Sequence, residues 1–264
     1  SRRRALTEAR LFRISPTFAV LTAAFVVASI VASVAFLSVR ETSAAFDFEF
    51  TVDSTADTAD ASPDGVCDDG TGACTLRSAI EEANSADGNS LISFNIPGDG
   101  LHMISPQSLE LLPVLNNVTI DGYTQPGISM NSLAAGDGTN AALMIEIDGS
   151  ALGGTANGIT MIGNGSTVKG LVVNDFGGSG VLLLNANANK VAGNFIGTNV
   201  TGMDAQGNGV GITVNNAHGN TIGTTAAADT NIISGNGIGI VLTGNSEMNL
   251  VRRNLMRMKL RVGM

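Results

Sequence analysis

The stretch Gly180-Val181-Leu182-Leu183-Leu184-Asn185-Ala186-Asn187-Ala188-Asn189-Lys190-Val191-Ala192-Gly193-Asn194-Phe195-Ile196-Gly197 decides the fold of this chain. It holds three short apolar runs, and Gly or Asn separates each run from the next. A Gly followed by Ile or Val also occurs at Gly158-Ile159, Gly211-Ile212 and Gly239-Ile240, so the four pairs are 22, 31 and 28 residues apart. Three short strands in each unit, with loop insertions in the longer units, predict a parallel β-helix, a solenoid in which each unit forms one rung.

The composition of these units suits stacked rungs. Neighbouring rungs lie about 4.8 Å apart, so the interior positions should form columns of Val, Ile and Leu. The corners need a positive φ or a side chain that bonds the nearby backbone, and Gly and Asn supply these. Asn at equivalent corners can also bond from rung to rung, as in stacked amide ladders. An ordinary β-sandwich is the alternative, but its turns would not repeat in three phases.

A helix is predicted just before the first rung. Residues 75–84 begin with a natural N-cap, Thr75, and their apolar side chains lie on one narrow face. The open end of a solenoid exposes strand edges and interior side chains and therefore requires a cap. We expect Leu76, Ile80 and Ala83 to cover the first rung. Residues 46–90, which start with an alternating strand pattern, would then form an N-terminal cap, and residues 91–251 the β-helix.

A family resemblance agrees with this arrangement. The segment Cys74-Thr75-Leu76-Arg77-Ser78-Ala79-Ile80-Glu81-Glu82-Ala83-Asn84 resembles the one that gives CSLREA-domain proteins their name, and the similarity runs from about Phe50 to Val251. Thr119-Ile120-Asp121-Gly122-Tyr123-Thr124-Gln125-Pro126-Gly127 looks like its usual continuation. The resemblance implies a bacterial protein that is secreted or displayed at the cell surface, and no defined reaction. The expected fold is all-β: a right-handed parallel β-helix with an N-terminal capping helix.

The charge distribution excludes one class of partner. The net charge of the chain is −9, but residues 41–251 contain three basic residues against 22 acidic ones, a net charge of −19. A body this acidic repels phosphate backbones, so nucleic-acid binding is not expected.

The first 45 residues have the pattern of a targeting segment. Five Arg residues precede a run from Phe18 to Leu37 without a charged residue, and Ser43-Ala44-Ala45 matches the small-x-small pattern of a signal-peptidase site. The run is also long enough to span a bilayer as a helix. Residues 1–45 are thus predicted to be a signal peptide or a membrane anchor, and the rest of the chain is exported, with membrane contact only through this segment.

The two cysteines of the chain are both in the exported part. Cys67 and Cys74 lie close together, and in an oxidising compartment such a pair most simply forms a disulfide. A zinc site is the alternative, but two thiols without a nearby His are a poor set of ligands. The same loop is crowded with acidic residues, and Asp64, Asp68 and Asp69 could supply oxygen ligands to Ca²⁺; a solvated acidic loop is the other interpretation. No other cofactor is expected.

The end of the chain departs from the repeat. Residues 252–264 replace the expected Gly-Asn corner with a basic, Met-containing stretch. We interpret these residues as an atypical tail of a truncated chain; a basic amphipathic tail that binds a membrane surface is the alternative.

The residues of the body give little support to catalysis. Hydrolysis of acidic polysaccharides on a β-helix would need converging carboxylates with His, Arg or Lys beside them. The predicted solenoid offers two lysines, one His at His218, and five Asp residues about 25 residues apart: Asp121, Asp148, Asp175, Asp204 and Asp229. We therefore expect a non-catalytic surface module for adhesion or scaffolding, with a cell-surface protein or glycan as partner. A polysaccharide lyase or glycoside hydrolase is the alternative.

The loops of the longer units are the candidate contact surface of such a module. Insertions are predicted around residues 200–209 and 224–229. If both emerge at the same corner, they would lie one rung apart.

Overall fold

The structure, a computed structural model, describes residues 45–107, 109–115 and 117–256. The chain divides into two units after Ala45, and the second, Phe46–Met264, contains all the described residues except Ala45. The predicted signal peptide or anchor lies outside the described residues. Within the described ranges, no helix has the length and apolar character needed to cross a membrane.

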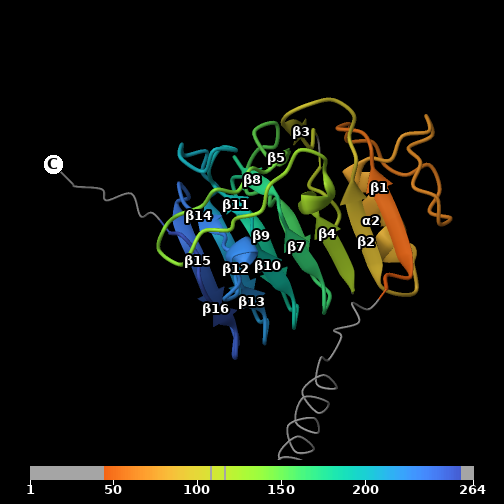
Figure 1. Cartoon of the computed structure of the whole chain (residues 1–264). Helices are drawn as coiled ribbons and strands as arrows, with labels where there is room; N and C mark the ends of the chain where they lie inside the picture. The colour runs from red at the N-terminus through yellow and green to blue at the C-terminus, as the bar shows by residue number, and fades with distance from the viewer. Residues whose placement is uncertain (1–44, 108, 116, 257–264) are drawn as a thin grey trace, which may run out of the picture. The chain divides into compact units, whose positions relative to one another are not determined.

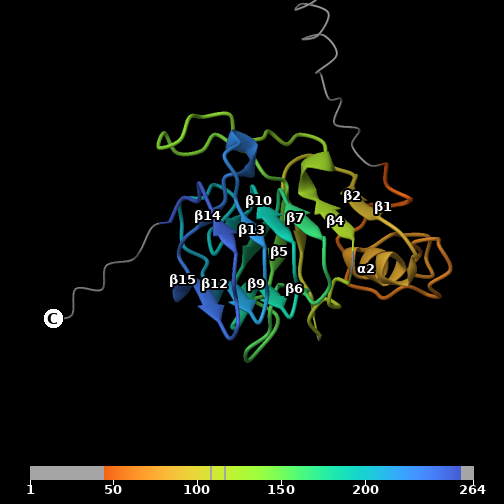
Figure 2. The ribbon, with the colours of Figure 1, turned by 90° about the horizontal axis from the view of Figure 1, so that it is seen from below.

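The second unit consists mainly of parallel β-strands, which form three sheets (Figures 1 and 2). The seven-stranded sheet has the order β1 (Phe48–Val52), β2 (Ser90–Phe94), β4 (Val118–Asp121), β7 (Thr167–Lys169), β10 (Lys190–Ala192), β13 (Thr221–Ile222) and β16 (Leu250–Val251). The five-stranded sheet has the order β14 (Ile232–Ile233), β11 (Phe195–Ile196), β8 (Val172–Asn174), β5 (Ile145–Asp148) and β3 (His102–Ile104). The four-stranded sheet has the order β15 (Ile238–Thr243), β12 (Val210–Asn215), β9 (Ser179–Leu184) and β6 (Ile159–Met161). The prediction of an all-β fold with parallel strands is confirmed.

Helices are few among the described residues. The α-helix α2 spans Leu76–Ser85, and the two short 3-10 helices are η1 (Gly122–Thr124) and η2 (Ala227–Asp229). The side chain of Thr75 accepts a hydrogen bond from the backbone N–H of Ser78, and the Ser78 side chain accepts one from the backbone N–H of Thr75. This reciprocal capping box fixes the start of α2 where the sequence placed it.

From β6 onward the chain visits the three sheets in a fixed order. It passes through the four-stranded, the seven-stranded and then the five-stranded sheet, and we call one such passage a circuit. The circuits are β6 to β8, β9 to β11 and β12 to β14, and β15 and β16 begin the next. Each strand pairs with its counterpart in the following circuit, as Val181 of β9 does with Ile212 of β12. The three-phase repeat in the sequence therefore corresponds to one strand in each sheet.

The core consists of apolar columns that run across the circuits. In the four-stranded sheet, in-register pairing aligns Ile159, Val181, Ile212 and Ile240. In the seven-stranded sheet it aligns Ile120, Val168, Val191, Ile222 and Val251. The side chains of these columns are fully buried in all circuits before the last one. The predicted columns of β-branched and Leu side chains are thus present.

Asn side chains connect successive circuits at the corners. In one ladder the Oδ1 of Asn220 accepts from the backbone N–H of Asn189 at 2.8 Å, and the Oδ1 of Asn249 accepts from that of Asn220 at 2.9 Å. Similar ladders join the side chains of Asn194, Asn231 and Asn254, and those of Asn208 and Asn236. The amide nitrogens also donate to carbonyls of the preceding turn, as Asn220 does to Ala186 at 2.9 Å. The predicted amide ladders therefore satisfy backbone groups that the corners would otherwise bury without partners.

The corner after β10 shows why glycine is needed in the repeat. Gly193 has a φ of +67°, and a Cβ at this position would overlap the hydroxyl of Tyr123 and the carbonyl oxygen of Ala228. That hydroxyl lies 3.0 Å from the Gly193 carbonyl oxygen and 2.8 Å from the Ala228 one. The corner therefore combines a left-handed backbone with a close approach of another chain segment.

At both ends of the body, strand pairing extends across a predicted segment boundary. β1 pairs in register with β2, so the strand assigned to a separate cap is the first strand of the seven-stranded sheet. At the other end, Leu255 pairs with Ile232 and Asn254 joins an amide ladder, so the repeat continues beyond Val251. Arg253 takes the corner position of Gly193 with a φ of +48°. A local pattern shows that a segment is extended, but not which distant strand it pairs with, and an Arg at a glycine position hides the corner.

The two insertions emerge at different corners. Residues 199–208 connect β11 of the five-stranded sheet to β12 of the four-stranded sheet. Residues 224–229 connect β13 of the seven-stranded sheet to β14 of the five-stranded sheet. The expected shared contact surface does not form, because the two loops leave the circuit at different phases.

Candidate functional site

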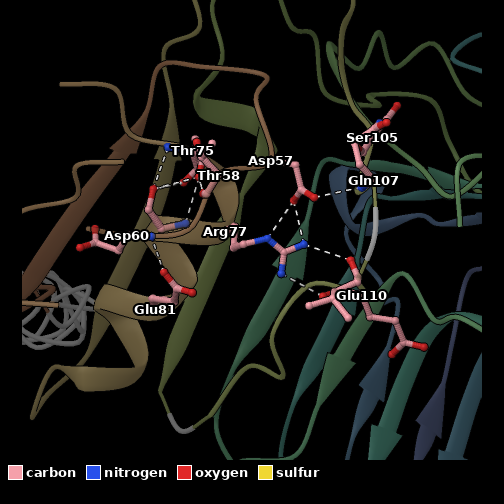
Figure 3. A network of polar contacts seen from close by, with 11 residues as sticks. Asp57, Thr58, Asp60, Thr75, Arg77, Glu81, Ser105, Gln107 and Glu110 are labelled. Atoms are coloured by element: carbon pink, nitrogen blue, oxygen red, sulfur yellow. Dashed lines mark hydrogen bonds and ion pairs between the residues drawn. The ribbon is translucent and has the colours of Figure 1, made fainter. Parts of the chain in front are cut away.

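The polar side chains of α2 hold neighbouring loops in place (Figure 3). Arg77 is 8% exposed, and its guanidinium forms an ion pair with Asp57 at 2.8 Å. The same guanidinium donates to the carbonyl oxygens of Glu110 and Leu109, each at 3.0 Å. The second oxygen of the Asp57 carboxylate accepts from the backbone N–H of Gln107 at 3.0 Å. One buried Arg therefore ties the loop before the helix to the segment that leads from β3 to β4.

The two glutamates of the motif fix the loop that precedes the helix. Glu81 accepts a hydrogen bond from the backbone N–H of Asp60. The carboxylate of Glu82, which is 1% exposed, accepts from the backbone N–H groups of Asp64 and Gly65 at 2.9 and 2.8 Å. These carboxylates accept the hydrogen bonds that the loop N–H groups would otherwise donate to backbone carbonyls in a helix or sheet. They are therefore not available to a substrate.

The other end of the helix is anchored in the same way. The side chain of Asn84 donates to the carbonyl oxygen of Pro113 at 2.9 Å and accepts from the backbone N–H of Leu115 at 3.0 Å. The segment that resembles the CSLREA motif thus organises the backbone on both sides of α2. Its polar residues Arg77, Glu81, Glu82 and Asn84 have structural partners.

The structure places the three predicted capping residues in the core. Leu76, Ile80 and Ala83 are 0%, 1% and 3% exposed, and α2 packs against β1 and β2 at the start of the seven-stranded sheet. Figure 2 shows the helix beside these two strands. Their role as a cap stays a prediction, which a substitution at Ile80 can test.

The predicted disulfide is confirmed. Cys67 and Cys74 are bonded, with 5.1 Å between their Cα atoms. The bond closes the loop whose backbone Glu82 also holds, and Cys74 directly precedes the N-cap of α2. The loop is thus fixed covalently at one point and by hydrogen bonds at others.

The three predicted calcium ligands accept hydrogen bonds within the turns in which they lie. Asp64 accepts from the backbone N–H of Val66, and Asp68 from those of Gly70 and Gly72. Hydrogen bonds from Thr71 and Thr58 lower the pKa of Asp69 to about 2. In the described part of the chain, no group of three or more His, Cys, Asp or Glu side chains is arranged to hold a metal ion. The structure therefore does not bring these three carboxylates together, and calcium binding stays a prediction.

A second group of carboxylates lies on the outer face of the five-stranded sheet. Glu146 and Asp148 are two residues apart on β5 and point to the same face, opposite to the core residue Ile147. Asn174 of β8 pairs in register with Asp148, and its Nδ2 donates to the carboxylate of Glu146 at 2.6 Å. Glu146 and Asp148 are 3% and 9% exposed. Two nearly buried carboxylates and an amide therefore lie side by side.

Asp148 and Asp175 differ in their surroundings. Asp148 accepts three hydrogen bonds, from the backbone and hydroxyl of Ser150 at 2.9 and 2.7 Å and from the hydroxyl of Ser105 at 3.1 Å. Burial raises the pKa of Asp175, and the charge of Asp148 raises it further, against a hydrogen bond from Gln206. When a carboxylate that accepts several hydrogen bonds lies near a carboxyl group with a raised pKa, the first can act as a base and the second as an acid.

This group corrects the interpretation of the Asp residues as isolated. Asp148 ends β5 and Asp175 directly follows β8, and these two strands pair, which the separation of the two residues in the sequence concealed. Glu146 was not among the predicted candidates. The signal that could have found it is the spacing of Glu146 and Asp148, which places both on one face of an extended segment.

The lysines of the body are paired with other Asp residues. Lys169 forms an ion pair with Asp121 at 2.7 Å, and Lys190 with Asp229 at 2.8 Å. His218 accepts a weak hydrogen bond from the backbone N–H of Glu247 through its Nδ1 at 3.4 Å, as expected of a turn residue. These side chains are used to join circuits and loops, and none of these interactions involves the carboxylates of β5.

Comparisons with known proteins show no family. No protein-family model matches the chain, and no curated protein matches it. Among solved structures, the chain is similar to a protein of Parabacteroides merdae ATCC 43184 described as a "putative glycosyl hydrolase". The two are 10% identical, the TM-score is 0.37, and the alignment covers 69% of this chain and 88% of that one. A similarity of this size carries no argument about the activity of this chain.

Proposed function

We propose that the three sheets close around their shared columns into a right-handed parallel β-helix. The fixed order of visits to the sheets, the parallel in-register pairing and the amide ladders at the corners support this architecture. Connections between parallel strands are right-handed in nearly all known proteins, which supports the hand.

We further propose that the chain is an exported, non-catalytic surface module for adhesion or scaffolding. The observation that carries this proposal is that the polar side chains of the helix motif, Arg77, Glu82 and Asn84 among them, are bonded to loop backbone. A catalytic cleft needs titratable groups that converge on an open space, whereas these groups stabilise the fold. The stacked sheets offer long faces whose loops can vary without a change in the core.

The disulfide and the first 45 residues support export. A structural disulfide persists in oxidising compartments, and the basic flank and apolar run are typical of a segment that directs secretion. The partner of such a module would be a cell-surface protein or a glycan. Sugar binding would have to rely on hydrogen bonds more than on stacking, because the chain has no Trp and one Tyr.

Export and lack of catalysis are tested together. The full chain is expressed with its own N-terminal segment in a bacterial host, and intact cells and medium are probed with an antibody to residues 46–256. We expect labelled cells or secreted protein, and no product release from pectins, alginates or glycosaminoglycans with Ca²⁺ present. Retention of the chain in the cytoplasm would contradict export, and product release would contradict the absence of catalysis.

The second candidate function is polysaccharide hydrolysis at Asp148 of β5 and Asp175, which directly follows β8. The specific observation that favours it is the raised pKa of Asp175 next to Asp148, since a glycosidase needs one protonated and one ionised carboxyl group. Its test is the same polysaccharide panel with the variants Asp175→Asn and Asp148→Asn. Asp204→Asn is the matched control, because Asp204 is exposed and its carboxylate bonds the side chain of Asn199. Activity that Asp175→Asn abolishes and Asp204→Asn preserves would establish this alternative.

A further inference from the structure

Two buried oxygen atoms beside the carboxylates of β5 have no hydrogen-bond partner. Asn174 and Thr198 are 0% and 2% exposed, and the Oδ1 of the first and the Oγ1 of the second are unpaired within the described residues. The Nδ2 of the Asn174 amide donates to the carboxylate of Glu146 at 2.6 Å and to the carbonyl oxygen of Thr198 at 3.1 Å. Both unpaired oxygens therefore lie around this amide, beside Glu146. A buried polar atom without a partner is costly, which indicates a ligand at this place.

The negative charge beside these oxygens is not balanced by a basic side chain. Glu146 and Asp148 are 3% and 9% exposed, and neither forms an ion pair within the described residues. The groups that donate hydrogen bonds to them are neutral: the Asn174 amide, the backbone and hydroxyl of Ser150, and the hydroxyl of Ser105. Buried charges in proteins are usually paired or coordinate a metal ion. We call the two carboxylates and the two unpaired oxygens the oxygen cluster.

The burial of the oxygen cluster limits what can bind to it. A sugar ring or a peptide cannot reach side chains that are almost completely buried, so the ligand is a water molecule or a metal ion. Water would give the two unpaired oxygens a partner but would leave the carboxylates without a counter-charge. A hard cation provides both, and carboxylate and amide oxygens are the ligands that Ca²⁺ prefers. Mg²⁺ usually keeps several of its waters, which a nearly buried site accommodates less well.

The oxygen cluster is drawn from three neighbouring strands of the five-stranded sheet. Glu146 lies on β5, Asn174 on β8 and Thr198 shortly after β11, and β8 pairs with both of the other strands (Figure 1). Only two of the four members are acidic, so the cluster is not one of the groups of three acidic ligands that the described part of the chain lacks. A cation bound here would join three strands, at the point where the connection of residues 199–208 begins.

We propose that the oxygen cluster binds one Ca²⁺ ion, which joins β5, β8 and the segment after β11. Glu146 and Asp148 supply the negative charge, and Asn174 Oδ1 and Thr198 Oγ1 are the neutral ligands. Because the ion binds the folded chain, it stabilises the fold by mass action. Ca²⁺ is scarce in the cytosol and abundant outside the cell, so this stability is gained on export, like that of the disulfide.

Calorimetric titration of the full chain with Ca²⁺, in a non-ionic detergent and after treatment with EDTA, tests the proposal. We expect a dissociation constant on the order of 10⁻⁴ to 10⁻³ M, as in other extracellular sites, and a loss of affinity of at least about tenfold in Glu146→Gln. Glu49→Gln, on exposed β1, is the matched control and should bind as the native chain does. The triple variant Asp64→Asn, Asp68→Asn and Asp69→Asn should also keep this site. No binding to the native chain, or binding that the triple variant abolishes and Glu146→Gln preserves, would overturn the proposal.

Thr198→Val tests the site with little risk to the fold. The hydroxyl that it removes is buried and bonds no other group in the described part of the chain, so without Ca²⁺ the variant should unfold at the native temperature or slightly above it. The affinity for Ca²⁺ should fall about tenfold, because one ligand is lost, and Ca²⁺ should raise the unfolding temperature less than in the native chain. An affinity and a Ca²⁺-induced shift that both match those of the native chain would overturn the site.

Discussion

The two ends of the body are built from the same columns but are covered differently. At the N-terminal end, Ile80 of α2 is 1% exposed and a network around Arg77 fixes the loops beside it. At the C-terminal end, Ile238 is 53% exposed and the strand edges have no further neighbour in the described part of the chain. A column of stacked Ile and Val side chains stabilises a circuit only when the next layer covers it. The covering layer is a separate requirement, which the repeat itself does not meet.

The largest difference in stability between the two ends is expected when a charged residue is placed at each of them. Ile80→Asp puts a carboxylate in the core without a partner and should lower the free energy of unfolding by about 4 kcal/mol and promote aggregation. Ile238→Asp, at the exposed end, should cost less than about 1 kcal/mol. Thermal and urea unfolding of the two variants measure the difference. Equal losses would show that α2 does not cover the core more effectively than solvent-exposed β15.

Removal of the disulfide tests how much the loop before α2 contributes to the stability of the N-terminal end. Cys67→Ser with Cys74→Ser frees the short loop held by Glu82, and the free energy of unfolding should fall by about 2–3 kcal/mol. Hydrogen exchange should increase in residues 57–74 and remain unchanged in β9 and β12. Faster exchange across all three sheets would mean that the loop stabilises the whole body.

The amide ladders allow the same comparison inside the repeat. Asn220→Ala leaves the backbone N–H of Asn189 and the carbonyl of Ala186 without partners in a buried corner, and should cost about 2 kcal/mol. Asn249→Ala removes the same two types of bond in the last circuit, where the residue is half-buried and water can replace the amide. Its cost should be less than about 1 kcal/mol. A larger loss for Asn249→Ala would indicate that the last circuit is covered in solution.

The repeat could be predicted from the sequence because its physical causes are local. Glycine and Asn at the corners, and Val, Ile or Leu between them, predicted the parallel strands, the columns and the ladders. Thr75 and the apolar face after it located the start of α2, and the close pair of cysteines predicted the disulfide.

The pairing of segments that are distant in the sequence could not be predicted in the same way. Three features depend on which distant segments pair, not on local composition. They are the partner of β1, the continuation of the ladder to Asn254 and the corners at which the two insertions emerge. For the same reason, Glu146 and Asp148 could not be connected to Asp175: the adjacency arises only when β5 and β8 pair. The role of Arg77 also required the structure, because its partners Asp57 and the carbonyl of Glu110 come from two separate segments.

The smallest expected effect concerns Asp175, which lies between the two ends. Its pKa is raised in the folded protein, so the folded state binds more protons than the unfolded state between the two pKa values. Stability from this group is therefore complete below the unfolded pKa near 3.8 and is lost as the pH rises through the folded pKa. Asp175→Asn removes the charge and keeps a residue that tolerates the φ of +58° at this position.

At pH 7 this variant should be more stable than the native chain by a few tenths of a kcal/mol, since the side chain is partly exposed and solvent screens the interaction with Asp148. The gain should disappear near pH 3, where the native carboxyl is protonated. Urea unfolding of both proteins at the two pH values measures it. A loss of stability at pH 7 would mean that the ionised carboxylate is favoured in the fold, and that Asp148 and Asp175 do not act on each other as described.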